Sequence, residues 1–285
     1  MNKLKIAVQK SGRLHDDSMK ILKEIGISID NGKDQLKASA RNFPLEVFYL
    51  RNGDIPQYLR DGVVDAAIIG ENVLFEKGED IKINERLGFS KCRVSIAVPK
   101  SSKINSLKEL AGKRIATSYP NTVNSFLEKE KIKANLHIIN GSVEIAPNIG
   151  LADGVCDIVS SGSTLFKNGL KEIQVLLKSE AVLASSPKIS NENKLLIEKI
   201  QFRLKSVLRG RENKYVLLNA PNEKIDAITK ILPGMNSPTI LPLAKEGWSS
   251  LHSVINKNDF WNVIDELKAN GAEGILVCPI ENMVL

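Results

Sequence analysis

Residues 61–70 read Asp-Gly-Val-Val-Asp-Ala-Ala-Ile-Ile-Gly, and residues 153–162 read Asp-Gly-Val-Cys-Asp-Ile-Val-Ser-Ser-Gly. Both stretches have the pattern of a glycine that ends a helix, then a short apolar strand, then a glycine turn. An earlier pair is also related, because residues 4–8 read Leu-Lys-Ile-Ala-Val and residues 113–117 read Lys-Arg-Ile-Ala-Thr. Similar segments that recur in the same order predict two lobes built on one plan.

Short apolar strands alternate with short helices through the first two thirds of the chain. The strands are expected over 4–8, 45–50, 66–69, 93–99, 114–117, 136–139, 155–159 and 173–185. The helices are expected over 16–25, 55–61, 71–77, 106–111, 121–131, 146–153 and 191–209, and Ser106 with Glu109 forms a capping box at the start of one of them. This alternation predicts parallel sheets covered by helices on both faces, with a cleft between the lobes. Ligands should bind in the loops that follow the strands.

The last third of the chain has a different pattern. After residues 209–213 it reads as strand 214–219, helix 222–231, strands 237–243 and 251–256, helix 258–270 and strand 273–279. The order βαββαβ is the ferredoxin-like arrangement. We therefore divide the chain into a first lobe (1–92 with 179–210), a second lobe (93–178) and a C-terminal domain (213–285).

The composition narrows the class of protein. The chain has 285 residues, with 42% hydrophobic and 26% charged residues and a net charge of +7, which is ordinary for a globular protein. The basic residues are spread along the chain and only 5% of residues are aromatic, so we expect no nucleic-acid partner. No apolar run suggests a membrane segment or a secretion signal, so we expect a cytoplasmic location. The three cysteines and three histidines have no metal-ligand spacing.

The segment 157–164, Asp-Ile-Val-Ser-Ser-Gly-Ser-Thr, is the strongest candidate for a binding site. An apolar strand ends there in small residues whose backbone N–H groups and hydroxyls can surround an anion. Asp157 could face a ribose hydroxyl or a bound Mg²⁺. A serine-rich turn that caps a helix would explain one hydroxyl more readily than four. The anion-binding candidates are Ser160, Ser161, Gly162, Ser163 and Thr164.

Weaker candidates lie in other loops that follow strands. Lys10, Ser11, Gly12 and Arg13 follow the first strand, and their two cations suit phosphate oxygens, although polar loops are common at such places. Glu71 and Glu144 are acidic groups near the cleft, yet each could simply occupy the first turn of a helix. Arg93 stands at a strand end, where a surface role is equally open. The sequence contains no Walker A motif, no G-x-G-x-x-G and no recognisable nucleophilic triad.

Taken together, these motifs resemble those of the ATP phosphoribosyltransferases in their long form. The resemblance spans the whole chain in order and is carried by residues 9–13, 68–73, 114–120, 140–147, 150–153, 157–164 and 237–243. It implies two lobes like those of type II periplasmic binding proteins, followed by an ACT-like C-terminal domain. It also implies a Mg²⁺-dependent reaction, the first of histidine biosynthesis, in which N1 of ATP attacks C1 of phosphoribosyl pyrophosphate.

The resemblance also suggests roles for the candidate residues. Residues 160–164 would hold the 5′-phosphate of the sugar and Asp157 a ribose hydroxyl, with Glu144 as a further acidic group. Residues 10–13, with Glu71 and Arg93, would contact ATP or pyrophosphate. Many phosphoribosyltransferases carry two adjacent acidic residues, but here Cys156 takes the place of one, so the metal is expected on pyrophosphate and not on a side chain.

The C-terminal domain would sense histidine as a feedback inhibitor. Thr239, Gly271 and Ala272 are the candidate contacts, although such a domain could serve assembly alone. The family suggests dimers and hexamers. Two other interpretations stay open at this stage: a ligand-binding protein with two lobes, or a regulatory subunit that binds nucleotide without turnover.

Overall fold

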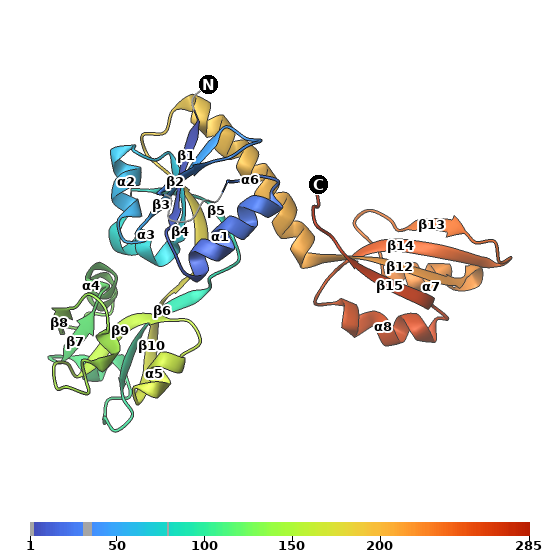
Figure 1. The fold of residues 1–285 in the computed structure, drawn as a ribbon. Coiled ribbons are helices and arrows are strands. Elements are labelled where there is room, and N and C mark those ends of the chain that lie inside the picture. Colours follow the sequence, from blue (N-terminus) through green and yellow to red (C-terminus); the bar gives the residue numbers. More distant parts are fainter. Residues whose placement is uncertain (1–2, 31–35, 79) are drawn as a thin grey trace. The chain divides into compact units, whose positions relative to one another are not determined.

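A computed structural model describes residues 3–30, 36–78 and 80–285, and it divides into two compact units, Met1–Lys199 and Ile200–Leu285. The strands of the first unit form two separate sheets (Figure 1). Helix α6 (Asn191–Glu212) begins in the first unit and ends in the second.

The first sheet has the strand order β2-β3-β1-β4-β11-β5. Its strands are β1 (Leu4–Gln9), β2 (Lys37–Ser39), β3 (Leu45–Leu50), β4 (Ala66–Gly70), β5 (Lys82–Arg86) and β11 (Ala181–Ser185). Strands β3, β1 and β4 are parallel, whereas β2, β11 and β5 run antiparallel to their neighbours. Its helices are α1 (Arg13–Glu24), α2 (Ile55–Asp61) and α3 (Glu71–Lys77), with α1 on one side and α2 and α3 on the other (Figure 1).

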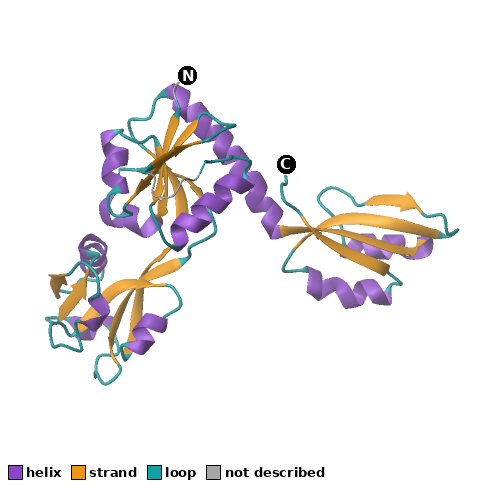
Figure 2. Cartoon of the chain, in the orientation of Figure 1, coloured by secondary structure: helices purple, strands orange, loops and turns teal. Residues whose placement is uncertain are grey.

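The second sheet has the strand order β10-β6-β9-β7-β8. Its strands are β6 (Cys92–Pro99), β7 (Arg114–Thr117), β8 (Asn135–Ile138), β9 (Gly154–Val159) and β10 (Leu170–Ser179). Helices α4 (Pro120–Lys129) and α5 (Ser163–Lys167) accompany it, with the 3-10 helices η1 (Leu107–Leu110) and η2 (Val143–Ile145). A single residue, Glu180, separates β10 from β11, so the chain passes directly from this sheet back to the first (Figure 2).

The second unit confirms the expected βαββαβ order. Its strands are β12 (Asn213–Pro221), β13 (Thr239–Pro242), β14 (Trp248–Asn256) and β15 (Glu273–Pro279), and its helices are η3 (Asn222–Lys224), α7 (Ile225–Ile231) and α8 (Phe260–Ala269). The sheet order β13-β14-β12-β15 is antiparallel throughout. Alternate residues of β12, Val216 and Leu218, pack with Ile228 and Leu267 of the helices, so both helices cover one face.

Several expectations about secondary structure were wrong. No helix covers 146–153, because residues 146–150 form turns and Gly150 has a φ of 74°, outside the helical region. The single strand 173–185 is two strands in different sheets. The sheets are mixed rather than parallel, and strands β2 and β5 were not predicted. The capping box of Ser106 and Glu109 is present, but on the 3-10 helix η1.

The two copies of the sequence repeat are out of register in space. Asp65 bonds the backbone of Lys5 at the start of β4, and Asp153 bonds the backbone of Arg114 in the same way at the start of β9. Asp153 therefore corresponds to Asp65 in space, although the sequence pattern aligned it with Asp61, four residues earlier. As a result, Asp157 lies near the carboxyl end of β9 and not at its start.

Candidate active site

Strand β9 carries Asp157 to a loop of small residues. The loop turns at Gly162, whose φ of 81° lies in the left-handed region where a side chain would be strained, and α5 begins at the next residue. Within the loop the Ser161 hydroxyl donates to the Ser163 hydroxyl at 3.0 Å. Ser160, Ser161, Ser163 and Thr164 are all exposed, so their hydroxyls are accessible to an anion.

A cavity of about 190 Å³ lies against this loop and brings together all the residues predicted to bind phosphoribosyl pyrophosphate. Its lining includes Glu144, which comes from η2, and Asp157, as well as the whole loop. The members shared with the prediction are Glu144, Asp157, Ser160, Ser161, Gly162, Ser163 and Thr164. Two carboxylates and several hydroxyls thus surround one space of the size of a small phosphorylated group.

The Asp157 carboxyl has a raised pKa. Burial is the main cause, since it disfavours the charged form, and the nearby charge of Glu144 adds to it. The Ile158 N–H donates to Oδ1 of Asp157 at 2.8 Å and opposes this shift. Burying a carboxylate without an ion-pair partner costs stability, and such groups are frequent at functional sites.

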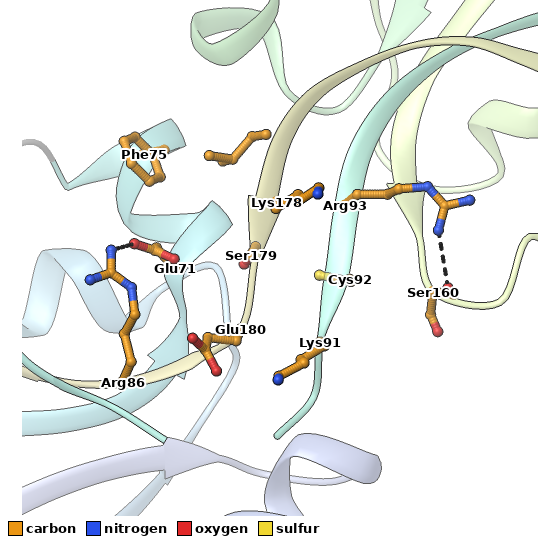
Figure 3. Close-up of a pocket in the computed structure, with 11 residues that line it drawn as sticks. Glu71, Phe75, Arg86, Lys91, Cys92, Arg93, Ser160, Lys178, Ser179 and Glu180 are labelled. Atoms are coloured by element: carbon orange, nitrogen blue, oxygen red, sulfur yellow. Dashed lines mark hydrogen bonds and ion pairs between the residues drawn. The ribbon is translucent and has the colours of Figure 1, made fainter. Parts of the chain in front are cut away.

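A second cavity, of about 600 Å³, lies beside the ends of β6 and β10 that pair at Cys92 and Ser179 (Figure 3). Ser160 lines both cavities, so the two adjoin. The predicted residues Glu71 and Arg93 line the second cavity, which also contains three cations that were not predicted: Arg86, Lys91 and Lys178.

Both predicted residues in this cavity already have protein partners. Glu71 is only 5% exposed, and Arg86 donates to its Oε1 at 2.5 Å. Arg93 donates from Nε to both carboxylate oxygens of Glu172, at 2.9 and 3.0 Å, and from Nη1 to the carbonyl of Ser160 at 3.4 Å (Figure 3). Arg93 therefore binds the backbone of the loop at Ser160 and also lines the cavity.

The predicted cationic loop lies elsewhere on the first sheet, between β1 and α1. Gly12 has a φ of 90°, and Arg13 is exposed and lies 3.8 Å from Asp17. Neither of the two cavities is lined by Lys10, Ser11, Gly12 or Arg13. The structure therefore does not bring these four residues to the cavity that contains Asp157.

The three candidate histidine contacts are also separated. Thr239 begins β13 at one edge of the C-terminal sheet, and Gly271 and Ala272 precede β15 at the opposite edge. Ala272 is 6% exposed and belongs to the core of this unit.

Cys156, beside Asp157, is fully buried, and burial strongly raises the pKa of its thiol. In the described part of the chain, no three His, Cys, Asp or Glu side chains gather where they could hold a metal ion. Among the described helices, none combines the length and apolar character needed to cross a membrane.

Four residues at or near the cavities were not predicted, because no local sequence motif marks them. Arg86, Lys91, Glu172 and Lys178 lie on strands or linkers whose local pattern is that of an ordinary polar surface. Arg86, Lys91 and Lys178 come to the cavity, and Glu172 comes to Arg93, only through strand pairing and the crossing between the sheets, so no motif of adjacent residues could have indicated them.

Known proteins resemble this chain over its full length. Residues 51–206 match the family described as ATP phosphoribosyltransferase, and residues 210–282 match the one described as HisG, C-terminal domain. The ATP phosphoribosyltransferase of Cytophaga hutchinsonii is 53% identical over 281 residues, which cover 99% of this chain and 98% of that protein. The ATP phosphoribosyltransferase of Parabacteroides distasonis is 51% identical over 282 residues, which cover 99% of this chain and 100% of that protein.

A solved structure is similar to most of this chain. It is described as the ATP phosphoribosyl transferase (HisG:HisZ) complex from Thermotoga maritima, with a TM-score of 0.60 and 29% identity. The match covers 71% of this chain and 98% of that one.

Proposed function

Because this chain belongs to the ATP phosphoribosyltransferase family, we propose that its two adjoining cavities hold the two substrates of that reaction. The enzyme transfers a phosphoribosyl group from phosphoribosyl pyrophosphate to N1 of the adenine of ATP, the first step of histidine biosynthesis. The bond from C1 to the pyrophosphate oxygen breaks as the bond from N1 to C1 forms, and pyrophosphate leaves.

The cavity beside the loop suits the phosphoribosyl donor. Hydroxyls and N–H groups of residues 160–164 would donate to the 5′-phosphate oxygens, and the Asp157 carboxylate would accept a hydrogen bond from a ribose hydroxyl. Glu144 lies in the same cavity and would stabilise positive charge that develops on the sugar ring as pyrophosphate departs. The grouping of two carboxylates with this loop in one cavity is the single observation that carries the assignment.

The larger cavity suits ATP. Its three cations and Arg93 lie around a partly apolar space, which fits an adenine ring next to a phosphate chain. Lys10, Ser11, Gly12 and Arg13 would reach phosphates of ATP or pyrophosphate from the first sheet. The protein then contributes mainly position and charge neutralisation, since the reaction needs no covalent intermediate with the chain.

Mg²⁺ is the expected cofactor. The chain offers Asp157 and Glu144 in one cavity but, among the described residues, no cluster of three acidic, His or Cys ligands, so this donor set fits an ion held mostly by substrate phosphates. When bound, the ion would offset the negative charge of the diphosphate.

Histidine would inhibit the enzyme at the C-terminal domain, which we place at residues 213–285, after lobes formed by 1–92 with 179–210 and by 93–178. Thr239 is level with Leu217 of β12, two strands away, whereas Gly271 lies against Pro221 at the end of β12. Two strand spacings and four residues along the strand separate them by about 16 Å, which one amino acid cannot span. A histidine site that uses both edges would therefore need a second copy of the chain, in keeping with the expected dimers and hexamers. We place the enzyme in the cytoplasm.

The first test is a direct assay of the purified chain with ATP, phosphoribosyl pyrophosphate and Mg²⁺, with pyrophosphatase added to pull the reaction forward. Formation of N1-substituted adenine would be followed by absorbance, with and without histidine. A signal that histidine suppresses supports both the reaction and the feedback site. Binding of ATP without any signal would favour the interpretation as a regulatory subunit.

The substrate assignments need separate variants. Ser163→Ala should raise the KM for phosphoribosyl pyrophosphate, and Lys178→Ala, in the larger cavity, should raise the KM for ATP, each with little effect on the other. If both variants keep wild-type constants, the proposed placement of the substrates is wrong.

A further inference from the structure

Two helices from different sheets contact each other beside the cavities. Helix α3 follows β4 of the first sheet, and α4 follows β7 of the second (Figure 1). Asn72 and Glu76 are four residues apart on α3 and therefore share one face of that helix. Both are buried, at 3% and 5% exposure, although Phe75 between them is 49% exposed. The polar face of α3 is thus turned inward, which requires polar partners.

The start of α4 supplies these partners. Oε1 of Glu76 accepts from the N–H of Asn121 at 3.0 Å, and Oε2 accepts from the N–H and the hydroxyl of Thr122 at 2.9 and 2.8 Å. The Asn121 side chain donates to the Glu76 carbonyl at 2.9 Å, and Asn72 donates to the Tyr119 hydroxyl at 3.2 Å. We name this set of five residues the α3–α4 clasp.

The clasp replaces the local cap that α4 lacks. The first N–H groups of a helix have no partner within it and are usually satisfied by a side chain just before the helix. Tyr119 occupies that position in α4 and makes no such bond. The N–H groups at the second and third positions instead donate to Glu76 of the other sheet. The stability of α4 and the distance between the sheets therefore depend on the same carboxylate.

We propose that Glu76 is a positioning residue for catalysis. This inference rests on the proposed function, in which the donor lies on the second sheet and ATP phosphates are also held by the first. The clasp fixes the separation of the two sheets that carry the two half-sites. The reaction requires N1 of adenine, held at one half-site, to come into line with C1 of the sugar, held at the other. A misplacement of about 1 Å between reacting groups can lower a rate by about 100-fold.

The test replaces Glu76 by glutamine. The amide in Glu76→Gln has one acceptor oxygen in place of two, so it cannot accept from both Asn121 and Thr122, and the clasp is weakened while the substrate-binding residues remain. We expect kcat to fall by about tenfold or more, with each KM changed by less than about threefold, because each half-site is intact and only their alignment is lost. Thr122→Val, which removes only the hydroxyl bond, should give a smaller loss of kcat in the same direction.

Glu109→Gln is the matched control. Glu109 also accepts two backbone N–H groups at a helix start, from Asn105 at 2.6 Å and Ser106 at 3.1 Å, but it lies within the second-sheet region alone. Its variant should keep wild-type kcat. Hydrogen exchange at the Asn121 and Thr122 amides would verify that Glu76→Gln has opened the clasp.

The possible outcomes distinguish a failure of the role proposed for Glu76 from a failure of the proposed placement of the substrates. Faster exchange at these amides with unchanged kcat would overturn the role of Glu76, as would a change confined to KM. If Glu76→Gln does not fold, Thr122→Val with an unchanged kcat would overturn it equally. Unchanged KM values for Ser163→Ala and Lys178→Ala would instead refute the placement of the substrates, whatever Glu76 does.

Discussion

Replacing the Asp157 carboxylate by an amide should lower activity and, at neutral pH, raise stability. Asp157→Asn keeps the size of the side chain, and the amide oxygen can still accept from the Ile158 N–H, which lies 2.8 Å from Oδ1 in the wild-type protein. Charge and one acceptor oxygen are therefore the main properties that change.

The effect on activity follows from the lost hydrogen bond to the ribose. A hydrogen bond to a charged group contributes about 1.5–3 kcal/mol, which corresponds to a fall in kcat/KM for phosphoribosyl pyrophosphate of about 10- to 150-fold. The pH dependence changes as well. Activity of the wild-type enzyme should fall as the pH is lowered through the raised pKa of Asp157, because the acceptor becomes protonated, and the variant should lack this contribution.

The effect on stability has the opposite sign. Burial raises the pKa of Asp157 above its ordinary value of 3.8, so the native protein binds this proton more tightly than the unfolded chain does. Stability of the wild-type protein therefore decreases as the pH rises from the unfolded pKa to the native one, and stays lower above it. The variant carries no such charge, so its advantage should appear at neutral pH and shrink as the pH approaches 3.8.

Both effects can be measured on the same preparation. Initial rates at varied donor concentration give kcat/KM, and thermal unfolding at several pH values gives the difference in Tm between the two proteins. Wild-type kcat/KM in Asp157→Asn would refute the role of this carboxylate in binding the sugar. A lower Tm of the variant at pH 7 would show that burial is not the dominant influence on its charge.

Three further predictions concern the loop, the second cavity and the C-terminal unit. Gly162→Ala should cost about 1 kcal/mol of strain at its positive φ and raise the KM for phosphoribosyl pyrophosphate. Gly88→Ala, also at positive φ, should lower stability without changing that KM. Steady-state kinetics and thermal unfolding distinguish the two variants. Arg86→Ala should destabilise the protein by about 1–3 kcal/mol in urea unfolding, because the buried carboxylate of Glu71 loses its partner; unchanged stability would mean that water replaces the arginine. Thr239→Val should weaken inhibition by histidine without changing kcat, and an unaltered inhibition curve would exclude Thr239 from that site.

The fold was predictable to the extent that local patterns determine it. Most strand positions and the βαββαβ order followed from apolar runs and glycines, because these reflect burial and turns within a few residues. The direction of the sheet strands was not predictable in this way. Residues 173–185 look like one strand, and nothing in their local pattern reveals that the chain changes sheets at Glu180.

The candidate site was predictable where it is continuous in sequence. Asp157 and the loop after it were found because small residues with hydroxyls follow an apolar strand. The ion pairs of Arg86 with Glu71 and of Arg93 with Glu172 could not be found, since 15 and 79 residues separate the partners. The same holds for Glu76, which looks like a solvent-facing helix residue and instead caps a helix of the other sheet.

The register offset between the two copies of the repeat limits what can be exchanged between them. The sequence alignment of the repeats pairs Asp65 with Asp157. When the two strands are superposed by their geometry, however, these residues lie four positions apart along the strand, or about 13 Å. A chimera that put residues 61–70 in place of residues 153–162 would keep an aspartate at position 157. One aligned on strand position, with residues 65–70 in place of residues 153–158, would instead put Ile69 there and remove the acid from the donor cavity. A structural comparison of the two lobes that started from the sequence alignment of the repeats would superpose the start of one strand on the end of the other.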